Sequence, residues 1–384
     1  MDPLTITLLI VFTGIVLLPP IARGIRVPVI VTELLFGIVI GISLFDLIPK
    51  YPVVDFFSSF GLVYLMFLAG LEMNFGKMSR YIFKRAVAVA LTSVLVPFLV
   101  GVLLSYWVDV HPLLLGAILC TTSLGLILPL LKDIQLAEQS SQMLLTSVVL
   151  VDIISIFLLA FALVAIQGSF GMEFVYSLIL ILTLFLLPWL LNRGRLREKI
   201  GSRLSKEGHF NIEVRLAFAL IFLLAVISNQ LGFHSIIGAF IAGLIISEII
   251  PEAALGKENL QSFGYGFFIP LFFIFTGAKV NLPALFSNVH NLIILLVIVT
   301  AGILSKVISV AAVTKLGGLG LKESTAFGLF HAARLSLIVA AADISTELGV
   351  IDENMFAMFI ILAIVSATVA PILGKYILAK DTRK

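Results

Sequence analysis

Residues 140–165 read SSQMLLTSVVLVDIISIFLLAFALVA, and the single charged side chain in this stretch is Asp152. A helix of this length rises about 39 Å, which exceeds the roughly 30 Å hydrocarbon core of a bilayer. Asp152 would then lie near mid-depth. An ionisable group at that depth costs at least about 2.5 kcal/mol on insertion scales, so it faces protein or a water-filled cavity rather than lipid. We predict a membrane-spanning helix that carries a functional carboxylate.

The composition of the whole chain also indicates that the protein lies in a lipid bilayer. Of its 384 residues, 60% are hydrophobic and 12% are charged, and the mean hydropathy is +1.18. Soluble domains carry about 25% charged residues. The single cysteine, Cys120, excludes an internal disulfide framework, and a net charge of +3 does not suggest a nucleic-acid partner. The chain is therefore predicted to be an all-α polytopic membrane protein.

Thirteen apolar stretches are long enough to be membrane spans. They cover residues 4–20, 28–45, 56–73, 86–106, 112–131, 140–165, 173–191, 212–230, 233–249, 262–278, 290–314, 323–345 and 354–378. We expect the first to be a retained helix, because it has neither a basic flank nor a cleavage site.

The basic residues predict the orientation of these spans. Of 25 Lys and Arg residues, 21 fall on one side, Lys50 and Lys279 on the other, and Lys306 and Arg334 inside helices. The positive-inside rule makes the rich side cytoplasmic. We predict an inner-membrane protein whose N-terminus lies outside and whose C-terminus is cytoplasmic. The basic segment 192–211 is expected to lie against anionic membrane lipids.

Two pairs of segments resemble each other at nearly one offset. FLAGLEMN at 67–74 matches IFTGAKVN at 274–281, and VIVTELLFG at 29–37 matches SIIGAFIAG at 235–243. An offset of seven spans inverts the second copy, an arrangement typical of secondary transporters. We predict a single membrane domain over 1–384, with repeats at about 4–165 and 212–378 and a linking helix at about 173–191. Chance similarity between apolar segments is the alternative.

The repeat also predicts two interrupted helices. One contains CTTSLG at 120–125, and its partner contains GLFHAARLS at 328–336. Irregular backbone at membrane depth is tolerated only where it lines a cavity or is buried in protein. Thr121, Thr122 and Ser123 could then offer hydroxyls and carbonyls to a ligand. Alternatively, their hydroxyls bond back to the turns of an ordinary helix.

Three ionisable residues lie near mid-depth, namely Asp152, Lys306 and Arg334. The structural interpretation is a charge cluster that holds helices together, and Arg334 in particular would neutralise the C-terminal dipole end of a broken helix. For Asp152 we favour a functional interpretation. A partly dehydrated carboxylate holds either a proton or a hard cation, and competition at one group couples two fluxes. Na⁺ would take its other oxygen ligands from Thr121, Thr122 and Ser123.

For four further residues the sequence gives weaker evidence of a functional role. Glu33 and Glu72 are interpreted as boundary residues at the cytoplasmic ends of their spans, with an entry funnel as the alternative. His331 is either a proton relay or a hydrogen-bonded buried imidazole. Cys120 is interpreted as a small packing residue.

The chain resembles family 2 of the monovalent cation:proton antiporters, which includes the NapA-like exchangers and the Kef membrane domains. The resemblance rests on VPVIVTELLFGIVIG at 27–41, FLAGLE at 67–72, HSIIGAFIAG at 234–243 and PLFFIFTG at 270–277. It implies an NhaA-like fold with two crossed discontinuous helices, a homodimer, and a core that moves like an elevator against a scaffold.

The resemblance also implies roles for individual residues. Thr122 and Ser123 fall on the first helix break, and Asp152 falls on the ion-binding aspartate. Lys306 looks like the basic residue of the eleventh helix, and Arg334 like the arginine of the second broken helix. Family members often have a polar residue just before this aspartate, and this chain has Val151 there. Because Asp152 then stands alone, the resemblance favours one proton per cation. Lys306 is typical of the electrogenic type, and it could pair with Asp152.

We therefore predict a secondary antiporter that exchanges a monovalent cation, preferably Na⁺, for H⁺ and serves pH homeostasis. It would need no cofactor besides the transported ions. One alternative is a K⁺/H⁺ antiporter of Kef type without its regulatory domain, and another is an organic-solute:sodium symporter on a similar fold. An enzyme is not expected, because the sequence has neither HExxH nor Gly-x-Ser-x-Gly.

Overall fold

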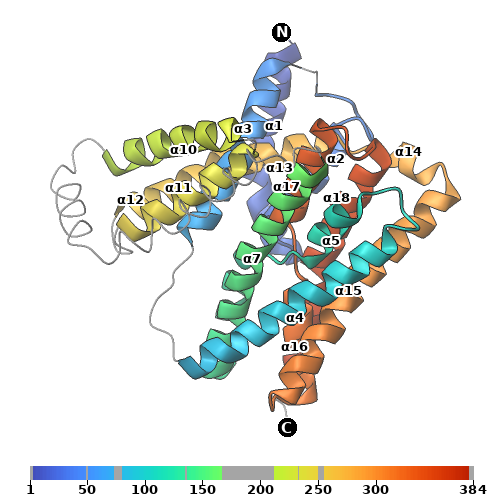
Figure 1. Ribbon diagram of the computed structural model, residues 1–384. Coiled ribbons are helices and arrows are strands. Elements are labelled where there is room, and N and C mark those ends of the chain that lie inside the picture. Colours follow the sequence, from blue (N-terminus) through green and yellow to red (C-terminus); the bar gives the residue numbers. More distant parts are fainter. Residues whose placement is uncertain are drawn as a thin grey trace. The chain divides into compact units, whose positions relative to one another are not determined.

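The computed structural model describes residues 3–48, 51–72, 80–134, 136–166, 212–231, 233–249 and 255–379 (Figure 1). Within these ranges every regular element is helical and no strand occurs. Nine of the described helices are long and apolar enough to cross a membrane, and three shorter apolar helices cover Val29–Ile40, Pro112–Ile127 and Ser235–Ser247. The predicted all-α, multi-pass membrane class is confirmed.

Twelve of the thirteen predicted spans coincide with these described helices. The remaining one, at 173–191, lies outside the described residues, as does the basic segment 192–211. The inverted repeat and the division into repeats stay predictions.

The chain divides into two compact units. The first takes in Met1–Val16, Pro49–Gly76 and Gln167–Phe275, and the second takes in Leu17–Ile48, Lys77–Ile166 and Thr276–Lys384. Two helices, α1 (Pro3–Ile25) and α13 (Ile269–Ala278), contribute residues to both units.

Glycines bring several of the remaining described helices of the first unit close together. They are α3 (Pro52–Leu71), α10 (Ile212–Gln230), α11 (Ser235–Ile249), α12 (Leu255–Phe263) and the π-helix η1 (Gly264–Phe268). A Cβ atom added at Gly243 of α11 would lie 2.0 Å from the Phe67 carbonyl oxygen of α3, and one at Gly70 would lie 2.1 Å from the Phe240 carbonyl oxygen. Small residues let helix backbones approach in a membrane, where dispersion forces supply much of the association energy.

The second unit contains both interrupted helices. Its described elements are α2 (Val29–Ile40), α4 (Arg80–Leu104), α5 (Pro112–Cys120), α6 (Leu124–Asp133), α7 (Glu138–Ile166), α14 (Leu282–Phe286), α15 (Val289–Leu316), α16 (Leu321–Ala332), α17 (Ser336–Glu347) and α18 (Glu353–Ala379). The stretch 112–131 breaks between α5 and α6 at Thr121–Ser123, where Thr121 and Ser123 have extended backbone. The stretch 323–345 breaks between α16 and α17 at residues 333–335.

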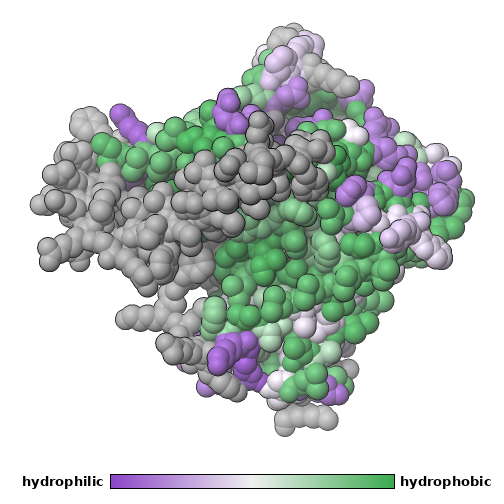
Figure 2. All heavy atoms as spheres, viewed as in Figure 1, coloured by the Kyte–Doolittle hydropathy of each residue, from purple (hydrophilic) through white to green (hydrophobic). Residues whose placement is uncertain are grey.

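The outer surface of the second unit suits a lipid environment. Hydrophobic side chains cover the visible face over α4 and α15 (Figure 2). On α4 the exposed residues Leu91, Leu95, Leu99 and Leu103 recur every four positions and form one apolar stripe. Because this stripe is both apolar and exposed, we expect it to face lipid.

The glycine contact between α3 and α11 gives a first prediction. Gly243→Ala should lower the unfolding free energy by about 1–3 kcal/mol, because the new methyl group overlaps backbone that must shift. Gly24→Ala on α1 is the matched control, since no atom lies within 4 Å of a Cβ built there. Thermal unfolding of the two purified variants in detergent measures the difference. Equal melting temperatures would show that α3 and α11 are not held this closely.

A carboxyl group at the end of α3 gives a second prediction. Glu72 follows the last residue of α3, and Tyr265 donates a 2.8 Å hydrogen bond to its Oε1. Burial raises the pKa of Glu72 above the usual 4.5, although Tyr265, Lys257 and Gln261 act in the opposite direction. A raised folded-state pKa stabilises the fold below the unfolded pKa, and this contribution is lost as the pH rises through the folded value.

Glu72→Gln keeps the acceptor for Tyr265 and cannot ionise. As the pH rises from about 4.5, the wild type should lose thermal stability relative to Glu72→Gln. Exposed Glu258 of α12 serves as a control through Glu258→Gln. Parallel melting curves for the wild type and Glu72→Gln across this range would contradict the assignment.

Candidate functional site

The two helix breaks of the second unit bind each other through one backbone hydrogen bond and one side-chain hydrogen bond. The Ser123 amide donates to the Ala333 carbonyl at 3.1 Å, and the Thr122 hydroxyl donates to the His331 carbonyl at 2.9 Å. Both hydroxyl-bearing residues are buried. Because an interrupted helix leaves backbone groups without helical partners, each break supplies partners to the other.

Asp152 lies at the N-terminal end of α6. Its Oδ2 accepts a 3.2 Å hydrogen bond from the Leu124 amide, the first residue of α6. Ser123 occupies the N-cap position, but its hydroxyl makes no capping hydrogen bond. A carboxylate is favoured at this positive end of the helix dipole. Asp152 thus takes the capping role, and the Ser123 hydroxyl is not used for it.

Two buried cations lie at the other side of this break, against the C-terminal end of α5. Lys306 donates to the Cys120 carbonyl at 2.5 Å and to the Thr122 hydroxyl at 2.6 Å. Arg334 donates to the Leu119 carbonyl at 2.5 Å and to the Gly302 carbonyl. Cations are favoured at the negative end of a helix. Arg334 therefore lies at the C-terminal end of a broken helix, as the structural interpretation of its charge predicts.

The three predicted hydroxyl ligands differ in what they already bind. Thr121 donates to the Ile118 carbonyl of its own helix at 2.9 Å, which is back-bonding of the ordinary kind. Thr122 donates to His331 and accepts from Lys306, which leaves one lone pair. Ser123 makes no capping bond. Of the three hydroxyls, that of Thr121 is the one bound within its own helix, and the roles of all three as cation ligands stay predictions.

Ser155 was missed by the sequence analysis. Its hydroxyl donates to the Cys120 carbonyl at 3.4 Å, so it contacts the end of α5 from α7. It follows Asp152 by three positions and shares a helix face with it. That spacing is the one feature of the sequence that could have indicated that Ser155 lies near the break. Direct pairing of Lys306 with Asp152 stays a prediction.

The position before Asp152 is apolar in its surroundings as well as in its side chain. Val151 packs with Cys120, Ala90 and Val94 in a buried cluster. Cys120 donates its thiol hydrogen to the Ala117 carbonyl at 3.2 Å, which agrees with its interpretation as a packing residue. Among the described residues, no group of three or more His, Cys, Asp or Glu side chains could hold a metal ion.

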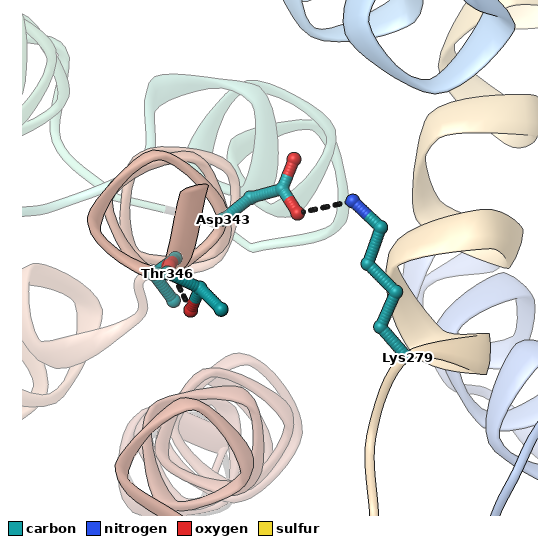
Figure 3. Close-up of polar contacts among 4 residues, drawn as sticks. Lys279, Asp343 and Thr346 are labelled. Carbon is teal, nitrogen blue, oxygen red and sulfur yellow. Dashed lines mark hydrogen bonds and ion pairs between the residues drawn. The ribbon is translucent and has the colours of Figure 1, made fainter. Parts of the chain in front are cut away.

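A second charged contact lies elsewhere in this unit. Lys279, in the turn after α13, extends toward α17 and forms a 2.8 Å ion pair with Asp343, as Figure 3 shows. The Asp343 side chain is 2% exposed and that of Lys279 is 39% exposed. Sequence analysis did not pair these residues, since they are 64 positions apart and no local pattern links them.

Broken helices that meet beside a partly buried carboxylate, within a multi-pass membrane protein, are typical of an ion-coupled transporter. Comparison with known families agrees, because the transmembrane sodium/hydrogen exchanger family matches residues 8–380. The chain belongs to this family. The predicted exchanger family is confirmed, and so is the prediction of a transporter rather than an enzyme.

Individual relatives extend over the whole chain. The probable Na⁺/H⁺ antiporter 3 of Methanocaldococcus jannaschii is 28% identical over 382 residues, covering 98% of this chain and 97% of that protein. The putative Na⁺/H⁺ antiporter YjbQ of Bacillus subtilis is 30% identical over 374 residues, covering 92% of this chain and 60% of that protein. The solved structure of the sodium proton antiporter MjNhaP1 from Methanocaldococcus jannaschii shares the fold, with a TM-score of 0.63, 18% identity and coverage of 99% and 98%.

The contacts of the threonines give a third prediction. Thr122→Val keeps the shape of the side chain but removes the donor to His331 and the acceptor for Lys306. Leaving buried groups without partners should cost about 1–3 kcal/mol of unfolding free energy. Thr121→Val is the matched control, because that hydroxyl bonds only within its own helix. Thermal unfolding in detergent compares them, and an equal loss in both variants would contradict the asymmetry.

Proposed function

We propose that this protein is a secondary antiporter that exchanges a monovalent cation, preferably Na⁺, for H⁺ by competition at Asp152. The observation that carries the proposal is the place of this carboxylate. Asp152 Oδ2 holds the Leu124 amide, one residue from the Ser123 amide that binds the second break. The names of the relatives support the choice of ions.

The chemistry of the break suits a small hard cation. Na⁺ takes oxygen ligands, and the break supplies hydroxyls at Thr122 and Ser123 beside the carboxylate. A carboxylate has about four lone-pair sites, and Asp152 Oδ2 accepts from the Leu124 amide. A proton and a cation cannot both neutralise the single charge of Asp152. The downhill movement of one ion therefore drives the other through the same site.

Alternating access is proposed to follow an elevator path, in which the second unit moves as a body and carries the site. The division of the chain into two compact units supports this, because both breaks, Asp152, Lys306 and Arg334 belong to the second unit. We further propose a homodimer in the inner membrane, with the N-terminus outside and the C-terminus in the cytoplasm. The distribution of Lys and Arg supports the orientation.

One proton per cation is the proposed stoichiometry. The residue before Asp152 is Val151, so this position supplies no second carboxylate. Val151 lies in an apolar cluster. The exchange should then be electroneutral, and its rate should not change when a potassium diffusion potential is imposed across the membrane.

Exchange by reconstituted protein tests the proposal. Proteoliposomes with an imposed pH gradient and an internal pH dye are challenged with Na⁺, K⁺ or Li⁺. Asp152→Asn should abolish cation-evoked proton movement, because an amide cannot exchange a proton for a cation. Asp55→Asn, which alters an exposed carboxylate in the first turn of α3, should retain it. Size-exclusion chromatography and melting curves confirm that each variant is folded.

The outcomes separate the alternatives. If exchange is greatest with K⁺, the protein is a K⁺/H⁺ antiporter of Kef type and not a sodium antiporter. Undiminished exchange in Asp152→Asn would exclude Asp152 as the shared site. Folded protein that exchanges none of the three ions, but takes up sodium with an organic solute, would be a symporter.

A further inference from the structure

His331 lies in the last turn of α16, immediately before the second break, and its side chain is fully buried. Both ring nitrogens have hydrogen-bond partners on other helices. Nδ1 is 3.2 Å from the Ser93 hydroxyl of α4, and Nε2 is 3.0 Å from the Ser147 hydroxyl of α7. One imidazole therefore links α16 to two neighbouring helices.

The serine contacts fit one neutral tautomer of the ring. When Ser147 donates its single hydroxyl hydrogen to the Leu144 carbonyl at 2.9 Å, it accepts from His331 at 3.0 Å. Nε2 then carries the hydrogen, and a neutral imidazole leaves Nδ1 as an acceptor for the Ser93 hydroxyl. All three side chains are satisfied in this arrangement, and the neutral ring needs no counter-ion in its buried position.

The backbone of the same segment holds the first break. The His331 carbonyl accepts from the Thr122 hydroxyl, and the Ala333 carbonyl accepts from the Ser123 amide. Thr122 in turn accepts from Lys306, and the residue after Ser123 donates to Asp152. A displacement of residue 331 would therefore reach the proposed cation ligands through two hydrogen bonds.

We propose that His331 is a positioning residue for cation binding. Its neutral ring is held between Ser93 and Ser147, which fixes the end of α16 so that its carbonyls hold Thr122 and Ser123 beside Asp152. This inference rests on the proposed exchange at Asp152 and adds a residue to it. The ring itself neither binds the cation nor carries the transported proton.

The test is sodium-dependent exchange in proteoliposomes containing the wild type, His331→Leu, His331→Gln, Ser147→Ala or Ser93→Ala. Loss of the ring contacts should raise the KM for Na⁺ about fivefold, the equivalent of one typical hydrogen bond. The kcat per folded molecule should change much less. His331→Gln, which keeps a donor and an acceptor, should restore part of the affinity. His290→Leu, at an exposed histidine of α15, is the control and should match the wild type.

Two results would overturn the inference while the proposed function stands. An unchanged KM in the serine variants and His331→Gln, with only the amount of folded protein reduced, would make the contacts purely structural. A shift in the pH dependence of exchange in His331→Gln would make the ring a proton carrier. The serine variants keep the test decisive if His331→Leu does not fold. Wild-type protein that exchanges no cation would remove the proposed function and this inference together.

Discussion

Every backbone polar group inside a bilayer needs a partner from the protein, because hydrocarbon offers none. A continuous helix meets this requirement by itself, whereas an interrupted helix does not. This chain interrupts two helices, and the two interruptions satisfy each other through Ser123 with Ala333 and Thr122 with His331. The other features of the site depend on that mutual arrangement, since it brings residues about 200 positions apart into hydrogen-bonding contact.

The charges follow from the same constraint. The break between α5 and α6 exposes a negative helix end and a positive helix end within a few residues. Lys306 and Arg334 bind carbonyls at the first, and Asp152 binds the amide at the second. Each charge therefore has a dipole of opposite sign, which reduces the cost of burying it. The structural and functional interpretations of these residues are thus compatible, because the contacts that stabilise the break also bring Asp152 to the residue that follows Ser123.

The rest of the fold makes weaker demands on the sequence. The described spans need apolar residues of suitable length, a lipid-facing stripe such as that of α4, and small residues where backbones approach, as at Gly70 and Gly243. Many sequences meet these demands. A solved exchanger with 18% identity accordingly shares the fold over 99% of this chain.

The sequence by itself determined the membrane class, twelve spans that the described helices match, the positions of both helix breaks and the three ionisable residues within the apolar spans. These are local properties, since span length, hydropathy and the cost of a buried charge can be read along the chain. Only the tertiary structure decided the partners: Lys306 with the Cys120 carbonyl, His331 with Ser93 and Ser147, and Lys279 with Asp343. Hydrogen bonds and ion pairs act over a few ångströms in space, and the residues that share them are 64 to 238 positions apart in the sequence.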